Sequence, residues 1–451
     1  MTNTSRRPSV LLLIADQLRG RDLHCTGNES VATPHIDALA ARGVVAERCY
    51  ANAPVCCPSR ATIFSGRYSM QHRVIDNDLP IPDDVPFFAQ PLRDAGYHTG
   101  YIGKWHLDGM PRSKFTPPGP RRHGFDFWAA YNCHHDYFNP RYYRDTDELV
   151  TAEGYEPVVQ TDLAVDFLNT LPADDPFCLV LTWGPPHDPY DQVPEEFRAH
   201  YREHRPTLPA NTDTTIPDIE DIYADYLAAI TALDTEMGRL TAALDELGRL
   251  DDTIIVVTSD HGDMLGAGGW TKKQLPCEEA VHVPFVVSWP SGLPAGERRD
   301  GLLSTVDVAA TLLDLTGVPA GFATDGTGRA DLLRDGAPGA EEVYLEGLTR
   351  FDESVAAGKP EWRGIRTTRW TYAEAVGRLP WLLFDNDADP LQERNLVADP
   401  GHADVRSDLA ARIEEHLHRT GDPFVPTASM VELLGLTELW EIREREMGAI
   451  P

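Results

Sequence analysis

The sequence predicts a mixed α/β protein with a mostly parallel sheet that is sandwiched by helices. Short apolar runs typical of buried strands alternate along the chain with longer stretches of helical spacing. The strand-like runs are Val10–Ala15, His98–Trp105, Phe177–Thr182, Thr253–Thr258 and Pro284–Trp289, and the helical stretches are Asp162–Leu171, Tyr223–Leu247 and Thr305–Leu315. In sheets of this kind, functional side chains gather at the carboxyl ends of the strands.

The chain of 451 residues is long enough for a large domain and a smaller one. We predict an α/β domain over residues 1–340 and a C-terminal α+β subdomain, with a small antiparallel sheet and a helix, over residues 341–451. The C-terminal strand-like pieces are Glu342–Glu346, Arg363–Ala373 and Trp381–Phe384, and a polar helix is predicted at Ala403–Arg419. Glycine- and proline-containing segments at 111–120, 206–217 and 317–340 predict surface connections.

The chain is strongly acidic, with a formal net charge of −31 from 71 acidic and 40 basic residues. This balance argues against nucleic acid or an anionic membrane surface as a partner, because such binding needs basic patches. An anionic substrate would need local cations that act against the overall field. The first apolar run is too short to span a membrane, so we expect a cytoplasmic protein unless a leader has been removed. The oligomeric state stays open.

Two pairs of polar residues follow predicted strands and are candidate metal ligands. Asp16-Gln17 end the first strand, and Asp260-His261 end the fourth. Such an oxygen-rich set suits a hard divalent cation, Ca²⁺ before Mg²⁺ or Mn²⁺. Each pair alone also fits a structural role at a turn.

The run Cys56-Cys57-Pro58-Ser59-Arg60 combines a thiol, a proline-started helix and a cation. Proline fits the first turn of a helix, where its missing N–H costs nothing. The helix N-terminus offers free N–H groups to an anion, and Arg60 adds a permanent charge. We therefore interpret Cys56 as a reactive residue and Cys57 as a buried core thiol.

Three further segments place cations and imidazoles near predicted strand ends. Lys104 and His106 would share one face of an extended strand. His187 lies in a loop stiffened by prolines, and Lys272-Lys273 follow Asp260 at a short distance. Taken singly, each segment also fits an exposed loop or turn.

These motifs, in this order, resemble those of the type I sulfatases. The matching stretches are C-x-P-S-R at Cys56, G-K-W-H-L at 103–107, P-H-x-P-Y at 186–190 and S-D-H-G at 259–262, with C-terminal matches around 383–396. The resemblance covers nearly the whole chain and implies an alkaline-phosphatase-like fold. It also implies that a maturation enzyme oxidises Cys56 to formylglycine, whose hydrated aldehyde is the nucleophile.

The resemblance assigns a role to each matching residue. It implies that Asp16, Gln17, Asp260, His261 and the modified Cys56 bind the metal. Arg60 and His106 would hold and deprotonate the hydrated aldehyde. Lys104, His187 and Lys273 would bind the sulfate, and His187 or Lys273 would protonate the leaving oxygen.

The chain departs from the family pattern at three positions. Gln17 and His261 stand where many members have Asp and Asn, so the anionic charge of the site is lower. Cys277 replaces a usual tyrosine, and Lys273 is preferred to Lys272 because of its distance from that position.

We therefore predict a sulfatase that hydrolyses a small anionic sulfate ester to an alcohol and sulfate. The segment at 131–137 is rich in aromatic and hydrogen-bonding groups, which favours a sulfated carbohydrate. Asn77, Asp78, Asn132 and His135 are candidate substrate-binding residues, although each equally fits a polar surface loop. One alternative is a phosphonate monoester hydrolase or phosphodiesterase of the same superfamily. A remote alternative is a catalytically inactive sulfate- or glycan-binding protein.

Overall fold

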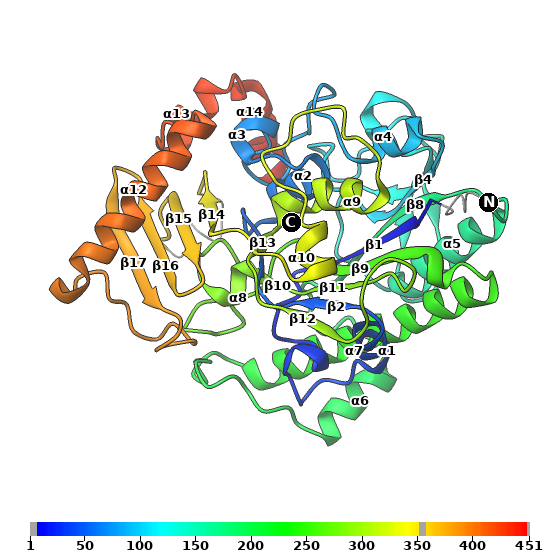
Figure 1. Ribbon diagram of the computed structural model, residues 1–451, viewed down its shortest axis with the longest axis horizontal. Coiled ribbons are helices and arrows are strands. Elements are labelled where there is room, and N and C mark those ends of the chain that lie inside the picture. The colour runs from blue at the N-terminus through cyan, green and yellow to red at the C-terminus, as the bar shows by residue number, and fades with distance from the viewer. Residues whose placement is uncertain (1–6, 351–357, 449–451) are drawn as a thin grey trace.

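An eight-stranded sheet forms the centre of the molecule (Figure 1). The computed structural model describes residues 7–350 and 358–448. Across the sheet the strands are β12 (Glu297–Arg299), β2 (Val44–Ala46), β11 (Phe285–Ser288), β9 (Thr253–Ser259), β1 (Ser9–Asp16), β8 (Phe177–Pro186), β4 (His98–Lys104) and β5 (Phe127–Tyr131). Neighbouring strands are parallel except around β11, which runs antiparallel to β9 and β2. The predicted mostly parallel sheet is thus confirmed.

Strand β1 shows why the sequences of the central strands are continuous apolar runs. All eight of its residues are buried. Leu12 and Ile14 pack into one apolar core, whereas Leu11 and Leu13 pack into another on the opposite face. Since side chains alternate along a strand, both faces of the sheet must be covered.

Helices cover both faces of this sheet. One apolar core includes α1 (Pro34–Ala41), α5 (Glu156–Thr170), α6 (Glu195–Glu203) and α7 (Ile219–Glu246). The other includes α2 (Cys56–Ser65), α4 (Ala89–Asp94), α9 (Val308–Thr316) and α10 (Ala330–Asp335). The expected connection at 317–340 therefore contains one short helix. None of the helices within the described ranges is long and apolar enough to cross a membrane.

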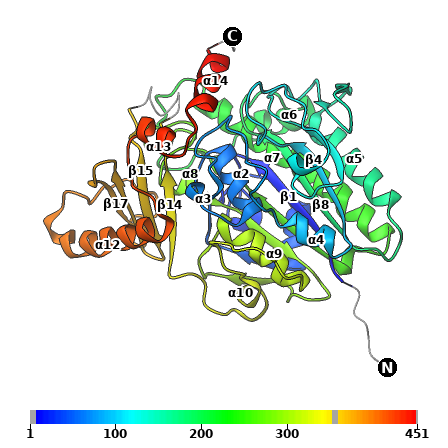
Figure 2. The same cartoon turned by 90° about the horizontal axis from the view of Figure 1, so that it is seen from above.

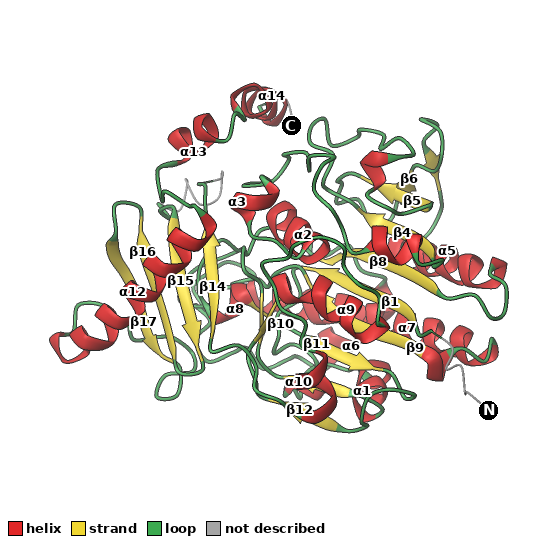
Figure 3. Ribbon diagram, turned by 45° about the horizontal axis from the view of Figure 1, so that its top comes forward, coloured by secondary structure: helices red, strands yellow, loops and turns green. Residues whose placement is uncertain are grey.

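A four-stranded antiparallel sheet lies beside the central one (Figure 3). Its strands, in order, are β14 (Glu342–Gly347), β15 (Trp362–Thr367), β16 (Trp370–Ala375) and β17 (Leu379–Asp385), and α12 (Ala403–Thr420) packs on it. The prediction of one strand-like piece at Arg363–Ala373 is wrong, because a hairpin occupies this stretch. The Thr367 hydroxyl accepts hydrogen bonds from the N–H groups of Arg369 and Trp370, which stabilises the turn.

The last two helices lead away from the small sheet along the outside of the molecule, and α14 lies at its edge (Figure 2). They are α13 (Thr427–Leu433) and α14 (Thr437–Met447). Met430 and Leu436 join an apolar core of the central sheet. Arg443 Nε donates a hydrogen bond of 2.8 Å to the carbonyl oxygen of Asn77. The C-terminal segment predicted as part of the subdomain therefore also packs on the large domain.

Candidate active site

The carboxyl ends of four neighbouring strands bring the candidate residues together. Asp16 ends β1, Lys104 ends β4, and Asp260 follows β9. His187 follows β8, which lies between β1 and β4. These positions agree with the expectation that functional side chains gather at this edge of the sheet.

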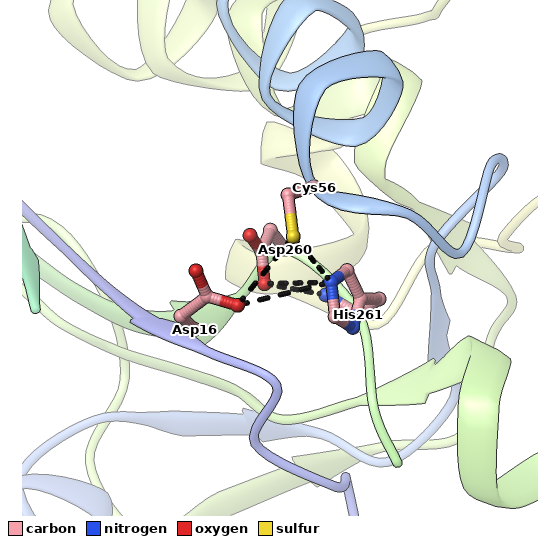
Figure 4. A group of neighbouring side chains, drawn as sticks. All are labelled: Asp16, Cys56, Asp260 and His261. Carbon is pink, nitrogen blue, oxygen red and sulfur yellow. Dashed lines mark hydrogen bonds and ion pairs between the residues drawn. The ribbon is translucent and has the colours of Figure 1, made fainter. Parts of the chain in front are cut away.

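Asp16, Cys56, Asp260 and His261 point toward one another (Figure 4). Their ligand atoms all lie within 4.8 Å of one another, and all four residues are buried. His261 Nε2 is 3.3 Å from Cys56 Sγ and 3.8 Å from one carboxylate oxygen of each aspartate. Two carboxylates and an imidazole are a donor set that suits a divalent cation.

Two cations, Arg60 and Lys104, contact the Oδ2 atoms of the aspartates, which face away from His261. Arg60 Nη2 is 3.2 Å from Asp16 Oδ2 and 3.0 Å from Asp260 Oδ2, and the Lys104 ammonium also donates to Asp16 Oδ2. Burial and the nearby Cys56 raise the pKa of Asp16, but Lys104, His187 and Arg60 more than offset this and hold it well below its ordinary value. Asp16 is therefore ionised, with Oδ1 facing His261 and Cys56.

The imidazole of His261 is oriented for a ligand. Its Nδ1 lies 2.8 Å from the carbonyl oxygen of Gly262, which has no proton to donate. The Nδ1 atom therefore carries the proton, and the lone pair of Nε2 faces the two carboxylates. The residues present thus fit a divalent cation.

Cys56 begins helix α2, two residues before the expected start at Pro58. Its side chain is 1% exposed. Burial raises the pKa of the Cys56 thiol, but Lys104, Lys273 and His261 lower it, with a hydrogen bond from His106, to well below its usual value. Cys57 instead belongs to an apolar core, as predicted.

His106 contacts the carboxylate of Asp78, a residue that the sequence analysis gives as a candidate for substrate binding. Strand β4 ends at Lys104, so the backbone leaves the extended conformation and His106 has a φ of 55°. His106 Nε2 lies 3.0 Å from Asp78 Oδ1. Arg112 donates two hydrogen bonds of 2.9 and 2.8 Å to the same carboxylate. The structure therefore uses Asp78 to orient His106.

Lys273 lies at the outer side of the cluster, where its Nζ is 2.7 Å from His187 Nε2 and 2.6 Å from Gln17 Oε1. Gln17 Nε2 donates to Asp263, which also accepts from the Tyr190 hydroxyl. Both polar atoms of the Gln17 amide are thus engaged by side chains. A role for Gln17 as a metal ligand stays a prediction.

The adjacent Lys272 has a different partner. Its Nζ lies 2.5 Å from Asp188 Oδ2, and both side chains are more than a quarter exposed. The two neighbouring lysines therefore face different surroundings.

Of the remaining candidates, His135 lies against the cluster. Its ring stacks on His187 with centroids 4.3 Å apart. Burial, followed by the proximity of His187, lowers the pKa of His135 to about 4, so the ring is neutral near pH 7. Asn77 accepts a hydrogen bond from the Cys57 N–H, and Asn132 donates to the carbonyl oxygen of Gly109. Substrate contacts by these residues stay predictions.

Glu156 is a residue that the sequence reasoning missed. It is 1% exposed and begins α5. Its carboxylate accepts a 2.8 Å hydrogen bond from Tyr131 and lies 3.3 Å from His134 Nε2. A Cβ at Gly184 would lie 2.8 Å from Glu156 Oε1. Glu156 thus connects the segment that carries His135 with the end of strand β8, which directly precedes His187. No local sequence motif predicts this contact.

Glu156 gives the protein a pH-dependent stability that can be measured. Burial raises its pKa to about 8 from a usual value near 4.5, so the folded protein binds this proton more tightly than the unfolded chain. The free energy of unfolding therefore falls as the pH rises from about 4.5 to about 8, by up to about 1.4 kcal/mol per unit. Urea unfolding at pH values between 5 and 9 measures this free energy. Its fall with rising pH should be smaller for Glu156→Gln than for the unaltered protein. The exposed control Glu195→Gln should follow the unaltered protein, and parallel curves for all three proteins would contradict this role.

Comparisons with known proteins agree with this geometry. Residues 8–318 match the sulfatase family model, and residues 266–419 match the model of the N-sulphoglucosamine sulphohydrolase C-terminal region. An ulvan-active sulfatase of Formosa agariphila is 33% identical over 429 residues, which cover 93% of this chain and 82% of that protein.

Solved structures show the same fold. One, in complex with its substrate D-glucosamine-2-N,6-O-disulfate, has a TM-score of 0.82 at 25% identity and covers 93% of this chain and 99% of its own. The phosphonate monoester hydrolase of Agrobacterium radiobacter has a TM-score of 0.73 at 25% identity, covering 92% and 96%. The family match over residues 8–318 shows that the chain belongs to the sulfatases, sulfuric ester hydrolases of the alkaline phosphatase superfamily.

Proposed function

We propose that this sulfatase hydrolyses a sulfate ester of a sulfated carbohydrate, with a formylglycine derived from Cys56 and a divalent metal. The observation that carries this proposal is the position of Cys56 among Asp16, Asp260 and His261 and beside Lys104. A glycan substrate is supported by the relative named for ulvan and by the related structure that holds a glucosamine disulfate. A formylglycine-generating maturation enzyme would then be a partner of the chain.

The bound metal would act as a Lewis acid, and the formylglycine would supply the hydroxyl nucleophile. The chain's own residues would do the remaining work. Lys104, 3.9 Å from Cys56 Sγ, would hold a sulfate oxygen. His106, oriented by Asp78, would accept the proton of the second hydroxyl.

Lys273 and His187 would hold the sulfate on its outer side and protonate the departing oxygen. Their nitrogen atoms are 2.7 Å apart, so one proton can lie between them. The stacked His135 would support the ring of His187 from behind. Arg60 contacts both aspartates, and this supports a role in neutralising and fixing the metal ligands.

Removal of the metal should abolish turnover. The nucleophile loses its activation once the ion is gone, and the sulfate loses the Lewis acid that would polarise it. Dialysis against a chelator should therefore inactivate the enzyme, and Ca²⁺ should restore activity better than Mg²⁺ or Mn²⁺. Full activity after complete demetallation, checked by elemental analysis, would exclude the metal role.

A phosphonate monoester hydrolase or phosphodiesterase is the second candidate, favoured by the fold shared with the Agrobacterium radiobacter enzyme. Both substrate classes are monoanions that one metal and the same cations could hold. Turnover of a sulfated sugar, 4-nitrophenyl sulfate and a phosphodiester should be compared on one preparation. We expect the sulfated sugar to have the highest kcat/KM, and a large preference for the phosphodiester would overturn the proposal.

Peptide mass spectrometry tests the modification and the remote alternative of an inactive binding protein. In protein from the native host, the peptide that contains Cys56 should carry an aldehyde in place of the thiol. An unmodified thiol in every copy, together with no turnover of any ester, would favour the binding protein.

The lysine pair allows a matched test of the site. Lys273→Ala removes a cation that lies against His187 and Gln17, whereas Lys272→Ala removes one that pairs with the partly exposed Asp188. Loss of one preorganised donor lowers kcat by about 10²–10³-fold. We expect such a loss in kcat for Lys273→Ala and a change within about threefold for Lys272→Ala, since exposed pairs contribute little. Equal losses would contradict the assignment of Lys273.

A further inference from the structure

A cavity of about 230 Å³ lies where the small sheet meets the central one. It is lined from the large domain by the segments after β1 and β2 and by β10 (His282–Val283) and β12, and from the small sheet by β15 and the end of β17. None of the catalytic candidates described above lines it. Its basic and aromatic lining residues are Arg21, Arg48, Arg298, Arg366, His282 and Tyr50.

The cavity gathers positive charge in a chain with a net charge of −31. Four arginines line it against three carboxylates, those of Glu47, Glu278 and Asp387, which leaves a surplus of one positive charge. The arginines come from four segments that are far apart in the sequence, so local sequence bias does not explain their meeting. Guanidinium groups that lie this close repel one another, and an anion bound between them would relieve this repulsion.

Two of the acids already have partners, and one arginine does not. Glu278 lies 2.7 Å from Arg366 Nε, and Glu47 lies 2.6 Å from Arg298 Nε. Arg48 is half-buried and makes no side-chain hydrogen bond or ion pair with any residue in the described ranges. A half-buried guanidinium without a protein partner can bind an oxyanion through two parallel N–H groups.

We propose that this cavity binds a second sulfate group of a sulfated oligosaccharide, at a distance from the ester that is hydrolysed. This deepens the proposed function and rests on it for the substrate class. Arg48 would donate to the sulfate, while Arg366 stays fixed by Glu278 and by the ring of Tyr50, 5.0 Å from its guanidinium carbon. The exposed side chain of Thr368, which also lines the cavity, would meet sugar hydroxyls.

The sheet fixes the separation between the two sites. Strand β2 runs parallel to β1, because β11 between β9 and β2 is antiparallel to both. The ends of β1 and β2 therefore lie at the same edge of the sheet, three strand spacings apart, or about 14 Å. Asp16 ends β1 in the catalytic cluster, and Ala46 ends β2 at the cavity. This separation exceeds one sugar ring, so the cavity selects an oligosaccharide over a monosaccharide.

Isothermal titration calorimetry can test the cavity apart from catalysis. The full chain with Cys56→Ser would be titrated with a sulfated glucosamine–uronate tetrasaccharide, with D-glucosamine-2-N,6-O-disulfate and with sodium sulfate. When Arg48→Ala is added to the Cys56→Ser variant, tetrasaccharide binding should weaken by about tenfold, because one charged hydrogen bond is lost. Binding of the monosaccharide should not change. Arg48→Glu should weaken tetrasaccharide binding further. The control Arg445→Ala removes an exposed charge elsewhere and should change neither.

The remaining outcomes overturn the proposal. They are no binding of the tetrasaccharide, no effect of either Arg48 substitution, and an equal loss for both saccharides. Sodium sulfate binding that depends on Arg48 without any tetrasaccharide preference would assign the cavity to inorganic sulfate instead. Failure of the proposed function is seen separately, as the absence of sulfated-sugar turnover by the enzyme with Cys56 intact, and leaves these binding results interpretable.

Discussion

The buried guanidinium of Arg60 holds the site together, because it lies between two carboxylates that would otherwise repel each other. Asp16 and Asp260 extend from adjacent strands, β1 and β9, and both are fully buried. Two such charges without compensation would be costly, and one shared cation offsets much of that cost. Because Arg60 belongs to α2, the same contact also fixes the start of this helix and therefore Cys56.

Other parts of the site depend on this arrangement. The carbonyl oxygen of Lys104 accepts hydrogen bonds from Arg60, Tyr101 and Thr182, so the end of β4 is tied to α2 and β8. On the outer side, the contacts of Lys273 with His187 and Gln17 connect the loops that follow β9, β8 and β1. The result is a set of rigid strand ends and helix starts rather than a flexible loop surface, which suits a site that must hold charges in a fixed geometry.

The sequence predicted the central strands and the residues at their ends well. Those positions are marked by local signals: apolar runs for buried strands, and short motifs at their carboxyl ends. The turn at Thr367 was missed because a strand-like composition hides a side-chain hydrogen bond to the backbone. Glu156 and Arg48 were missed for a different reason. Their importance comes from neighbours far away in the sequence, which a single chain without its fold does not reveal. The contacts of Asp78 with His106 and Arg112 were missed for the same reason.

The contact between α14 and Asn77 has a consequence for the order of events during synthesis. Arg443 donates to the Asn77 carbonyl oxygen, and the Asn77 side chain accepts from the Cys57 N–H at the start of α2. The first of these bonds joins residues 366 positions apart, so it forms only after the chain up to Arg443 has left the ribosome. Cys56 is buried in the folded protein. If it is modified as proposed, the oxidising enzyme must reach Cys56 before residues as distant in the chain as His261 fold against it, so the time available depends on how fast translation and folding bring them there.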